Sequence, residues 1–246
     1  MKILVCVSKA PDTTTKIAFV DNDTKFNEDK VQYIVNPYDE WYALVRALEL
    51  KETLGGTVTT ITVGTAADDA IIRKAFAIGA DEGVRIDANP TDAYFVASEI
   101  ADYAKKNQFD LVLLGKETID YNGSQVGAMV AELLDMPFIS LATKLDVAGQ
   151  TATVERDITG GTEVLELSLP AVISAAKGMA EQRIPNMKGI MAARTKPLNV
   201  VAPAAAESLT GIKKYSLPPA KGAIKMFGVD DMDALVNSLH NDAKVL

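Results

Sequence analysis

The chain has 246 residues, of which 48% are hydrophobic and 24% are charged, which is typical of a folded protein with a sizeable core. Its net charge of −8 disfavours nucleic acids and anionic membranes as general partners. One cysteine and one histidine exclude an intrachain disulfide framework and the metal motifs that need two histidines.

The first half of the chain alternates short apolar runs with stretches of helical periodicity. The apolar runs predict strands at residues 3–7, 57–63, 83–86 and 111–114. Apolar residues at helical spacing predict helices around residues 39–54, 71–78, 96–103 and 126–134. Such repeated strand–helix units predict a doubly wound, Rossmann-like α/β fold with a mostly parallel sheet.

Two stretches and the C-terminal part depart from this alternation. Residues 16–35 carry two weak strand patterns, which predict a small antiparallel excursion. Residues 141–169 predict three short strands, before residues 169–174 return to the main sheet. The proline-rich part that follows contains a single predicted helix, at residues 229–239, and such an irregular segment suits wrapping around a neighbour. We therefore predict an α/β domain at residues 1–197 and a partner-wrapping, extended tail at residues 198–246.

The segment Gly115–Gly127 is the strongest candidate for ligand binding. It leads from the end of a predicted strand into the start of a helix, and ligands bind at this edge of open α/β sheets. Backbone N–H groups of Asn122, Gly123 and Ser124 could face an anion, with the helix dipole behind them. The segment is neither a GxGxxG loop nor a Walker loop, so phosphate binding and a simple capped helix start remain equally open.

Two further loops, at residues 9–13 and 36–39, are expected at the same edge of the sheet. On its own, the second loop has a simpler explanation, because Pro37 and Asp39 are ordinary residues at the start of a helix.

Residues 177–197 combine positive charge with methionine. Five basic residues and one acidic residue give this segment a net charge of +4, and it holds three of the eight methionines. Flexible methionines suit a surface that fits several partners, and positive charge steers acidic partners toward it. The alternative is a core segment filled by methionine, with solvated charges.

The remaining reactive side chains give little support for catalysis. Cys6 lies in a predicted buried strand, and His240 is expected on an exposed helix. Motifs of the types GxSxG, HExxH and CxxC are absent, so we expect no catalytic residue and no metal ligand. The first apolar run is too short for a signal peptide, and no run of about 18 apolar residues predicts membrane insertion.

The pattern as a whole resembles the β subunit of electron transfer flavoprotein (ETF), over nearly the full length. The matching stretches read KAPDTTTKI, NPYDE, FAIGAD, DLVLLGKETID with SQVG, and VERDITGGTEVLELSLPAVIS. The last stretch carries the spacing of Arg156, a glycine pair, Glu163 and Pro170 that is typical of the family. One position departs, because Thr159 stands where the family usually has an acidic residue, and we assign it no role.

The resemblance implies an adenine nucleotide alpha hydrolase-like fold and a heterodimer with an ETF α subunit that holds the redox FAD. The β subunit would help to complete the flavin site and would bind a structural AMP. Carried over by position, the nucleotide would contact Cys6 (through its backbone), Asn36, Pro37, Tyr38, Asp39, Val63, Gly115, Lys116, Glu117, Thr118, Ile119, Asp120, Tyr121, Asn122, Gly123, Ser124, Gln125 and Val126.

The resemblance also implies contacts with other proteins. Thr13, Tyr38 and Asp157 would lie toward the flavin-bearing part of the α subunit. The segment at residues 175–197, here called the docking arm, would contact acyl-CoA and other flavin dehydrogenases. Met187 would be its apolar anchor, and the neighbouring docking residues would be Arg183, Lys188 and Met191.

The function implied is that of an electron carrier rather than an enzyme. Electrons would pass from the dehydrogenases to ETF-quinone oxidoreductase, as in fatty acid β-oxidation. The expected location is the cytoplasm of a bacterium or the mitochondrial matrix of a eukaryote, with no nucleic acid as partner.

Two alternatives remain open. An electron-bifurcating ETF would carry a second FAD in place of AMP, but such members tend to read GDTAQVGP where this chain reads YNGSQVGA, which favours AMP. A stand-alone adenine-nucleotide-binding module would have no neighbour for the tail to wrap, which disfavours that class.

Overall fold

The computed structural model describes all residues from Met1 to Leu246, and they form two compact units. Unit 1 comprises residues 1–17 and 27–213, and unit 2 comprises residues 18–26 and 214–246. Unit 1 contains the main sheet, the predicted nucleotide-binding residues and the docking arm.

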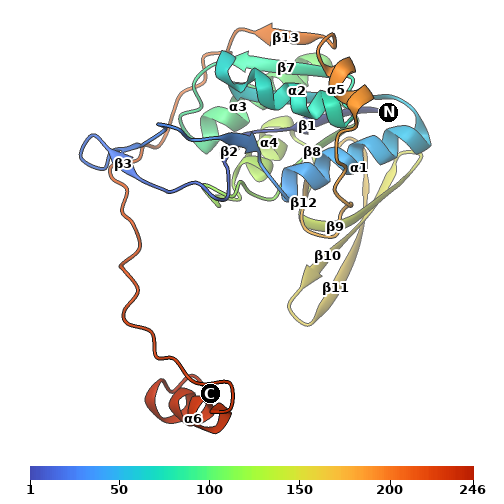
Figure 1. Cartoon of the computed structure of the whole chain (residues 1–246). Coiled ribbons are helices and arrows are strands. Elements are labelled where there is room, and N and C mark those ends of the chain that lie inside the picture. The colour runs from blue at the N-terminus through green and yellow to red at the C-terminus, as the bar shows by residue number, and fades with distance from the viewer. The chain divides into compact units, whose positions relative to one another are not determined.

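The main sheet of unit 1 has nine strands in the order β11-β10-β9-β12-β8-β1-β6-β7-β13 (Figure 1). In this order, adjacent strands from β9 to β13 pair in parallel, whereas β9, β10 and β11 form an antiparallel meander. The strands are β1 (Lys2–Cys6), β6 (Thr57–Gly64), β7 (Glu82–Asp87), β8 (Leu111–Gly115), β9 (Phe138–Ala148), β10 (Thr151–Ile158), β11 (Gly161–Ser168), β12 (Ala171–Ala175) and β13 (Leu198–Val201). The predicted fold class, a doubly wound and mostly parallel α/β sheet, is confirmed.

The order of the central strands reverses at β1. The chain runs outward from β1 to β6 and β7, and then returns to add β8 on the other side of β1. Ile3 accordingly pairs with Val58 of β6 and with Leu111 of β8. The ends of β1 and β8 therefore form a topological switch point, the place where open α/β sheets bind ligands.

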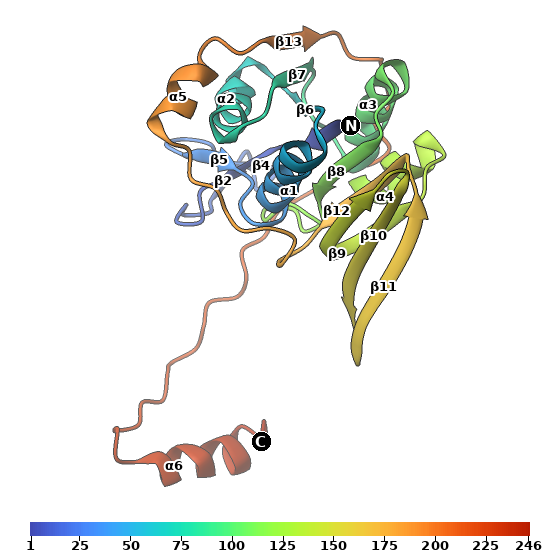
Figure 2. The ribbon, with the colours of Figure 1, turned by 90° about the vertical axis from the view of Figure 1, so that its right-hand side faces the viewer.

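Helices cover both faces of this sheet (Figure 2). On one face lie α1 (Asp39–Leu54) and α2 (Asp69–Ile78), and on the other lie α3 (Ala93–Asn107) and α4 (Val126–Leu134). Ile3 and Val5 of β1 pack into the first layer, and Leu4 and Cys6 pack into the second. A strand that is buried on both faces needs apolar residues at every position, which explains its unbroken apolar run.

Two elements of unit 1 are not predicted from the sequence. Helix α5 (Met187–Ala193) lies in the docking arm, and β13 pairs with the edge strand β7. Helix α5 is only seven residues long and contains Gly189, so its sequence carries little helical signal. Helix α1 spans the predicted residues 39–54, with Tyr38 rather than Asp39 at its N-cap position.

A carboxylate at the N-cap of α3 and another within α3 hold the segment that follows β13. Asp92 caps α3 by accepting a hydrogen bond from the backbone N–H of Phe95, and it also accepts from Leu209 and Thr210. Glu99 is 1% exposed and accepts from the backbone N–H groups of Ala204 and Ala206. Residues 204–210 are therefore fastened to unit 1 although they have no regular secondary structure.

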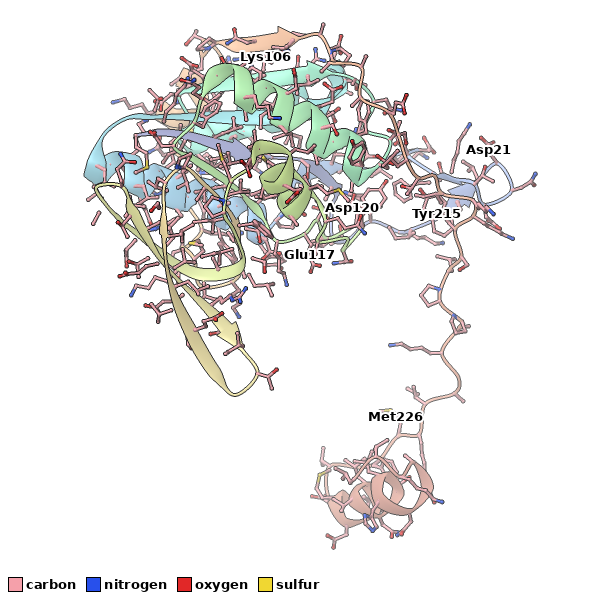
Figure 3. All side chains as sticks on the ribbon, turned by 180° about the vertical axis from the view of Figure 1, so that it is seen from behind. Asp21, Lys106, Glu117, Asp120, Tyr215 and Met226 are labelled. Atoms are coloured by element: carbon pink, nitrogen blue, oxygen red, sulfur yellow. The ribbon has the colours of Figure 1, made fainter.

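Two small antiparallel pairings lie around the predicted excursion at residues 16–35, and one of their four strands lies before that range. In unit 1, β2 (Lys9–Pro11) pairs with β5 (Tyr33–Val35). In unit 2, β3 (Phe19–Val20) pairs with β4 (Lys25–Phe26), and Tyr215 stacks on Phe19 with 4.8 Å between the ring centroids (Figure 3).

The C-terminal part of unit 2 exposes many large apolar side chains. It contains α6 (Met232–Asn237), inside the predicted range of 229–239, and a short turn of π-helix at Ser238–Asp242. Ile224, Met226 and Val229 are each at least 78% exposed. Partner wrapping by the tail stays a prediction. None of the helices in the chain combines the length and apolar composition that crossing a bilayer requires.

Candidate functional site

Asn36 joins three loops at the switch point. Its side chain is fully buried, donates from Nδ2 to the carbonyl oxygen of Glu117 (3.2 Å), and accepts at Oδ1 from the backbone N–H of Ile119 (3.0 Å). Its own backbone N–H donates to the carbonyl oxygen of Ser8 at 2.9 Å. The loops at residues 8–13, 36–39 and 115–126, here called the nucleotide loops, therefore meet at one edge of the sheet. The Asn36 amide is occupied by this junction, so it positions the loops.

Glu40 provides a second junction that the sequence reasoning missed. It lies in the first turn of α1, is 6% exposed, and accepts hydrogen bonds from the backbone N–H and the hydroxyl of Ser8, both at 2.7 Å. Burial raises the pKa of Glu40 to about 8, although the hydrogen bonds from Ser8 oppose this shift. The only signal for Glu40 in the sequence was its place in the first turn of a predicted helix, where acidic residues are favoured.

The raised pKa of Glu40 predicts that the free energy of unfolding falls as the pH rises. Between the unfolded pKa of 4.5 and the folded pKa of about 8, the folded protein binds a proton that the unfolded chain has released. The free energy of unfolding therefore decreases by up to about 1.4 kcal/mol per pH unit in this range. In Glu40→Gln this contribution should disappear, because the amide is uncharged and can still bond to Ser8.

The measurement is denaturant unfolding of the purified protein across this pH range. The exposed carboxyl of Glu207 gives a matched control, since Glu207→Gln should keep the pH dependence of the unsubstituted protein. Equal pH slopes in Glu40→Gln and in the control would assign the dependence to another group.

Gly115 brings the end of β8 against the start of α1. A Cβ atom at this position would lie 2.8 Å from the backbone nitrogen of Glu40 and 3.0 Å from Cβ of Asp39. Tyr38, which precedes this helix, has a φ of 66° and a side chain that is 53% exposed. A tyrosine held at positive φ is uncommon and is often found at functional sites.

The loop after β8 is shaped to present backbone donors. Asn122 and Ser124 have φ values of 47° and 50°, and the hydroxyl of Ser124 donates to Glu117 at 3.1 Å. The backbone N–H groups of residues 123–127 donate to no acceptor within the chain. Together with the N-terminus of the nine-residue α4, these groups can bind an anionic oxygen.

A hollow of about 230 Å³ lies beside this loop. Its lining includes Lys116, Ser124 and Gly127, together with side chains from β9 and β12. The Lys116 ammonium lies 3.4 Å from the Glu117 carboxylate. Burial opposes ionisation of Glu117, but the hydrogen bonds from Ser124 and Lys116 lower its pKa. Lys116 thus lines the hollow with a positive charge, and Glu117 lies next to Lys116 and Ser124 rather than in the lining itself.

The remaining predicted site residues lie on the surrounding strands and loops. Cys6 ends β1 and is 7% exposed, and burial raises the pKa of its thiol. Val63 lies near the end of β6, and the side chain of Thr13 is exposed. Asp157 of β10 lines a second hollow, which shares Leu141 with the first one. The contacts that the sequence predicts for these residues stay predictions.

The docking arm presents an apolar surface. The exposed fractions are 90% for Ile184, 73% for Met187 and 57% for Met191. Met179 differs, because it is 5% exposed and packs into the core. The interpretation as a docking surface thus applies to Met187 and Met191, and the interpretation as a core segment applies to Met179. Ile184 was missed from the sequence, where its only signal is an isolated apolar residue next to a proline.

Two of the five cations of the arm are engaged within the chain. Arg183 forms a bidentate pair with Glu52 of α1, at 2.6 and 2.8 Å. The ammonium of Lys196 donates to carbonyl oxygens of Phe76 and Ala80, and desolvation lowers its pKa. Glu52 therefore offsets the charge of Arg183, whereas Lys196 keeps its charge but holds its ammonium against carbonyl groups of the chain.

Comparison with known proteins shows one consistent family. A sequence model of the electron transfer flavoprotein domain matches residues 23–206. The electron transfer flavoprotein subunit beta of Bacillus subtilis is 36% identical over 261 residues, which cover 100% of both chains. That of Syntrophomonas wolfei is 41% identical, over 91% of this chain and 88% of the relative. The human subunit is 36% identical over 82% of each chain.

Proposed function

Because the chain belongs to the β subunits of the electron transfer flavoprotein family, we propose that it forms a heterodimer with an α subunit that holds the redox FAD. In such a carrier the flavin supplies the redox chemistry, and the protein supplies binding and orientation. The contribution of this chain is to bind a structural AMP, to support the α-subunit flavin through Thr13, Tyr38 and Asp157, and to receive dehydrogenases on its docking arm.

The observation that carries the nucleotide proposal is the junction of three loops at the switch point. Asn36 and Glu40 fix the loops against Ser8, Glu117 and Ile119 through hydrogen bonds of 2.7 to 3.2 Å. The free N–H groups at residues 123–127 suit the phosphate of AMP. These contacts support the binding of an adenine nucleotide but do not distinguish AMP from FAD. The sequence YNGSQVGA favours AMP over a second FAD.

The exposed apolar side chains of the docking arm support its role toward acyl-CoA and other flavin dehydrogenases. Apolar side chains as exposed as Ile184 and Met187 become buried when a partner docks. Electrons would leave the heterodimer toward ETF-quinone oxidoreductase. The corresponding location is the cytoplasm of a bacterium or the mitochondrial matrix of a eukaryote.

The proposal is tested by the nucleotides that the complex carries. The chain is co-expressed with its α subunit, the purified complex is denatured, and the released nucleotides are identified and counted. We expect one FAD and one AMP per heterodimer. Two FAD per heterodimer would replace this proposal by the electron-bifurcating one. Absence of both a complex and FAD would instead favour the stand-alone module.

A further inference from the structure

A reciprocal pair of cations fastens the docking arm to α2. Arg73 of α2 donates from Nη1 to the carbonyl oxygens of Ala193 (2.9 Å) and Lys196 (2.7 Å), at the C-terminal end of α5 and beyond it. Lys196 of the arm donates in return to the carbonyl oxygens of Phe76 (3.1 Å) and Ala80 at the C-terminal end of α2. Each cation thus satisfies carbonyl groups at the end of the other helix, where the helix dipole favours positive charge.

The two helices also touch along their backbones. A Cβ atom on Gly189 would lie 2.3 Å from the carbonyl oxygen of Ala77, so glycine permits the close approach of α5 to α2 (Figure 2). Ala193, at the end of α5, is 4% exposed and belongs to the core. A helix of seven residues has little stability of its own, so these contacts hold it in place.

The other end of the arm is fastened as well. Met179 is buried in the core, and Arg183 pairs with Glu52 of α1 through two hydrogen bonds. Between these attachments lie Ile184 and Met187, the two most exposed apolar side chains of the arm. The arm therefore holds an apolar surface between two fixed ends.

We propose that Arg73, Lys196 and Gly189 are positioning residues, which fix α5 on α2 so that Ile184 and Met187 reach the dehydrogenase in a preorganised arrangement. This inference rests on the docking function proposed above. A partner that meets an ordered surface does not have to order it on binding, so the apparent affinity is higher. None of the three residues needs to touch the partner.

The test uses Arg73→Gln in the complete heterodimer. If α5 then stays in place in about a tenth of the molecules, the KM of the dehydrogenase for the heterodimer rises about tenfold, while kcat and flavin content stay unchanged. Hydrogen exchange of the α5 amides should become faster in the same variant. Arg73→Lys keeps the charge and can restore one of the two bonds, so its KM should be intermediate.

Two further variants complete the design. Gly189→Ala pushes α5 away from α2 without a change of charge, and it should raise KM in the same way. Lys106→Gln removes one positive charge from α3, where Lys106 pairs only with Asp102, and it should leave KM unchanged. This control separates the loss of net charge from the loss of the fastening.

The outcomes distinguish this inference from the docking function itself. An unchanged KM in both Arg73→Gln and Gly189→Ala, with Ile184→Ala still raising KM, would overturn the positioning role and leave docking intact. If Ile184→Ala and Met187→Ala also left KM unchanged, the docking function would fail as well. An unchanged exchange rate of α5 in Arg73→Gln would show that Arg73 does not fasten it.

Discussion

Replacing both Ile184 and Met187 by alanine should lower kcat/KM for dehydrogenase-driven flavin reduction by about 100-fold. The two side chains are 90% and 73% exposed, so nearly all of their apolar surface is available to a docked partner. Burying each contributes about 1.5 kcal/mol, and every 1.4 kcal/mol changes an affinity about tenfold. The measurement is the initial rate of flavin reduction at subsaturating heterodimer.

Val200 supplies the control for this prediction. It is 55% exposed on β13, outside the docking arm, so Val200→Ala should leave the rate unchanged. The flavin content of the double variant should equal that of the unsubstituted complex. A loss of flavin, or a rate that matches the control, would count against a docking role for this surface.

Gly115→Ala should have the second large effect, on nucleotide content and on stability. The added Cβ atom would meet the backbone nitrogen of Glu40 at 2.8 Å, so the end of β8 and the start of α1 must separate. Overpacking of this kind costs about 2 kcal/mol, which lowers the Tm of a domain of this size by about 5 °C. The same separation pulls apart the nucleotide loops, so we expect less than about a tenth of the AMP to remain.

The control is Gly161→Ala, because a Cβ atom on Gly161 would have no neighbour within 4 Å. Tm and nucleotide content are measured on the same heterodimer preparations. A lowered Tm with full AMP content would show that the approach of β8 to α1 is needed for stability and not for the nucleotide.

The fold could be predicted from the sequence where burial imposes a simple pattern. The unbroken apolar runs at β1 and β8 mark strands that are covered on both faces, and the glycines after α1 and α2 mark helix ends. Helix α5 and strand β13 escaped prediction because they are short. Tertiary contacts, such as those of Arg73 and Gly189, stabilise α5 more than its local sequence does.

The candidate site was predictable in its loops and not in their connections. Strand ends and a predicted helix start marked the three nucleotide loops, but no local pattern shows that Asn36 reaches Glu117 or that Glu40 reaches Ser8. These pairs are 81 and 32 residues apart in the sequence, respectively. The local net charge of the arm was similarly incomplete, because Arg183 is paired with Glu52, which is distant in the sequence.

The position of β1 in the sheet also constrains the order in which the protein can fold. β1 is the first strand of the chain, yet its two neighbours are β6 and β8, which pair with it through Val58 and Leu111. Pairings between such distant segments form slowly, since closing the long intervening loop costs entropy before the contact forms. During synthesis, one edge of the apolar strand β1 therefore stays open until residues 111–115 have emerged. The nucleotide loops need residues up to 126, so the site can form only once about half of the chain has been made. A bound nucleotide would then stabilise those nascent chains in which β1 has paired with its correct neighbours.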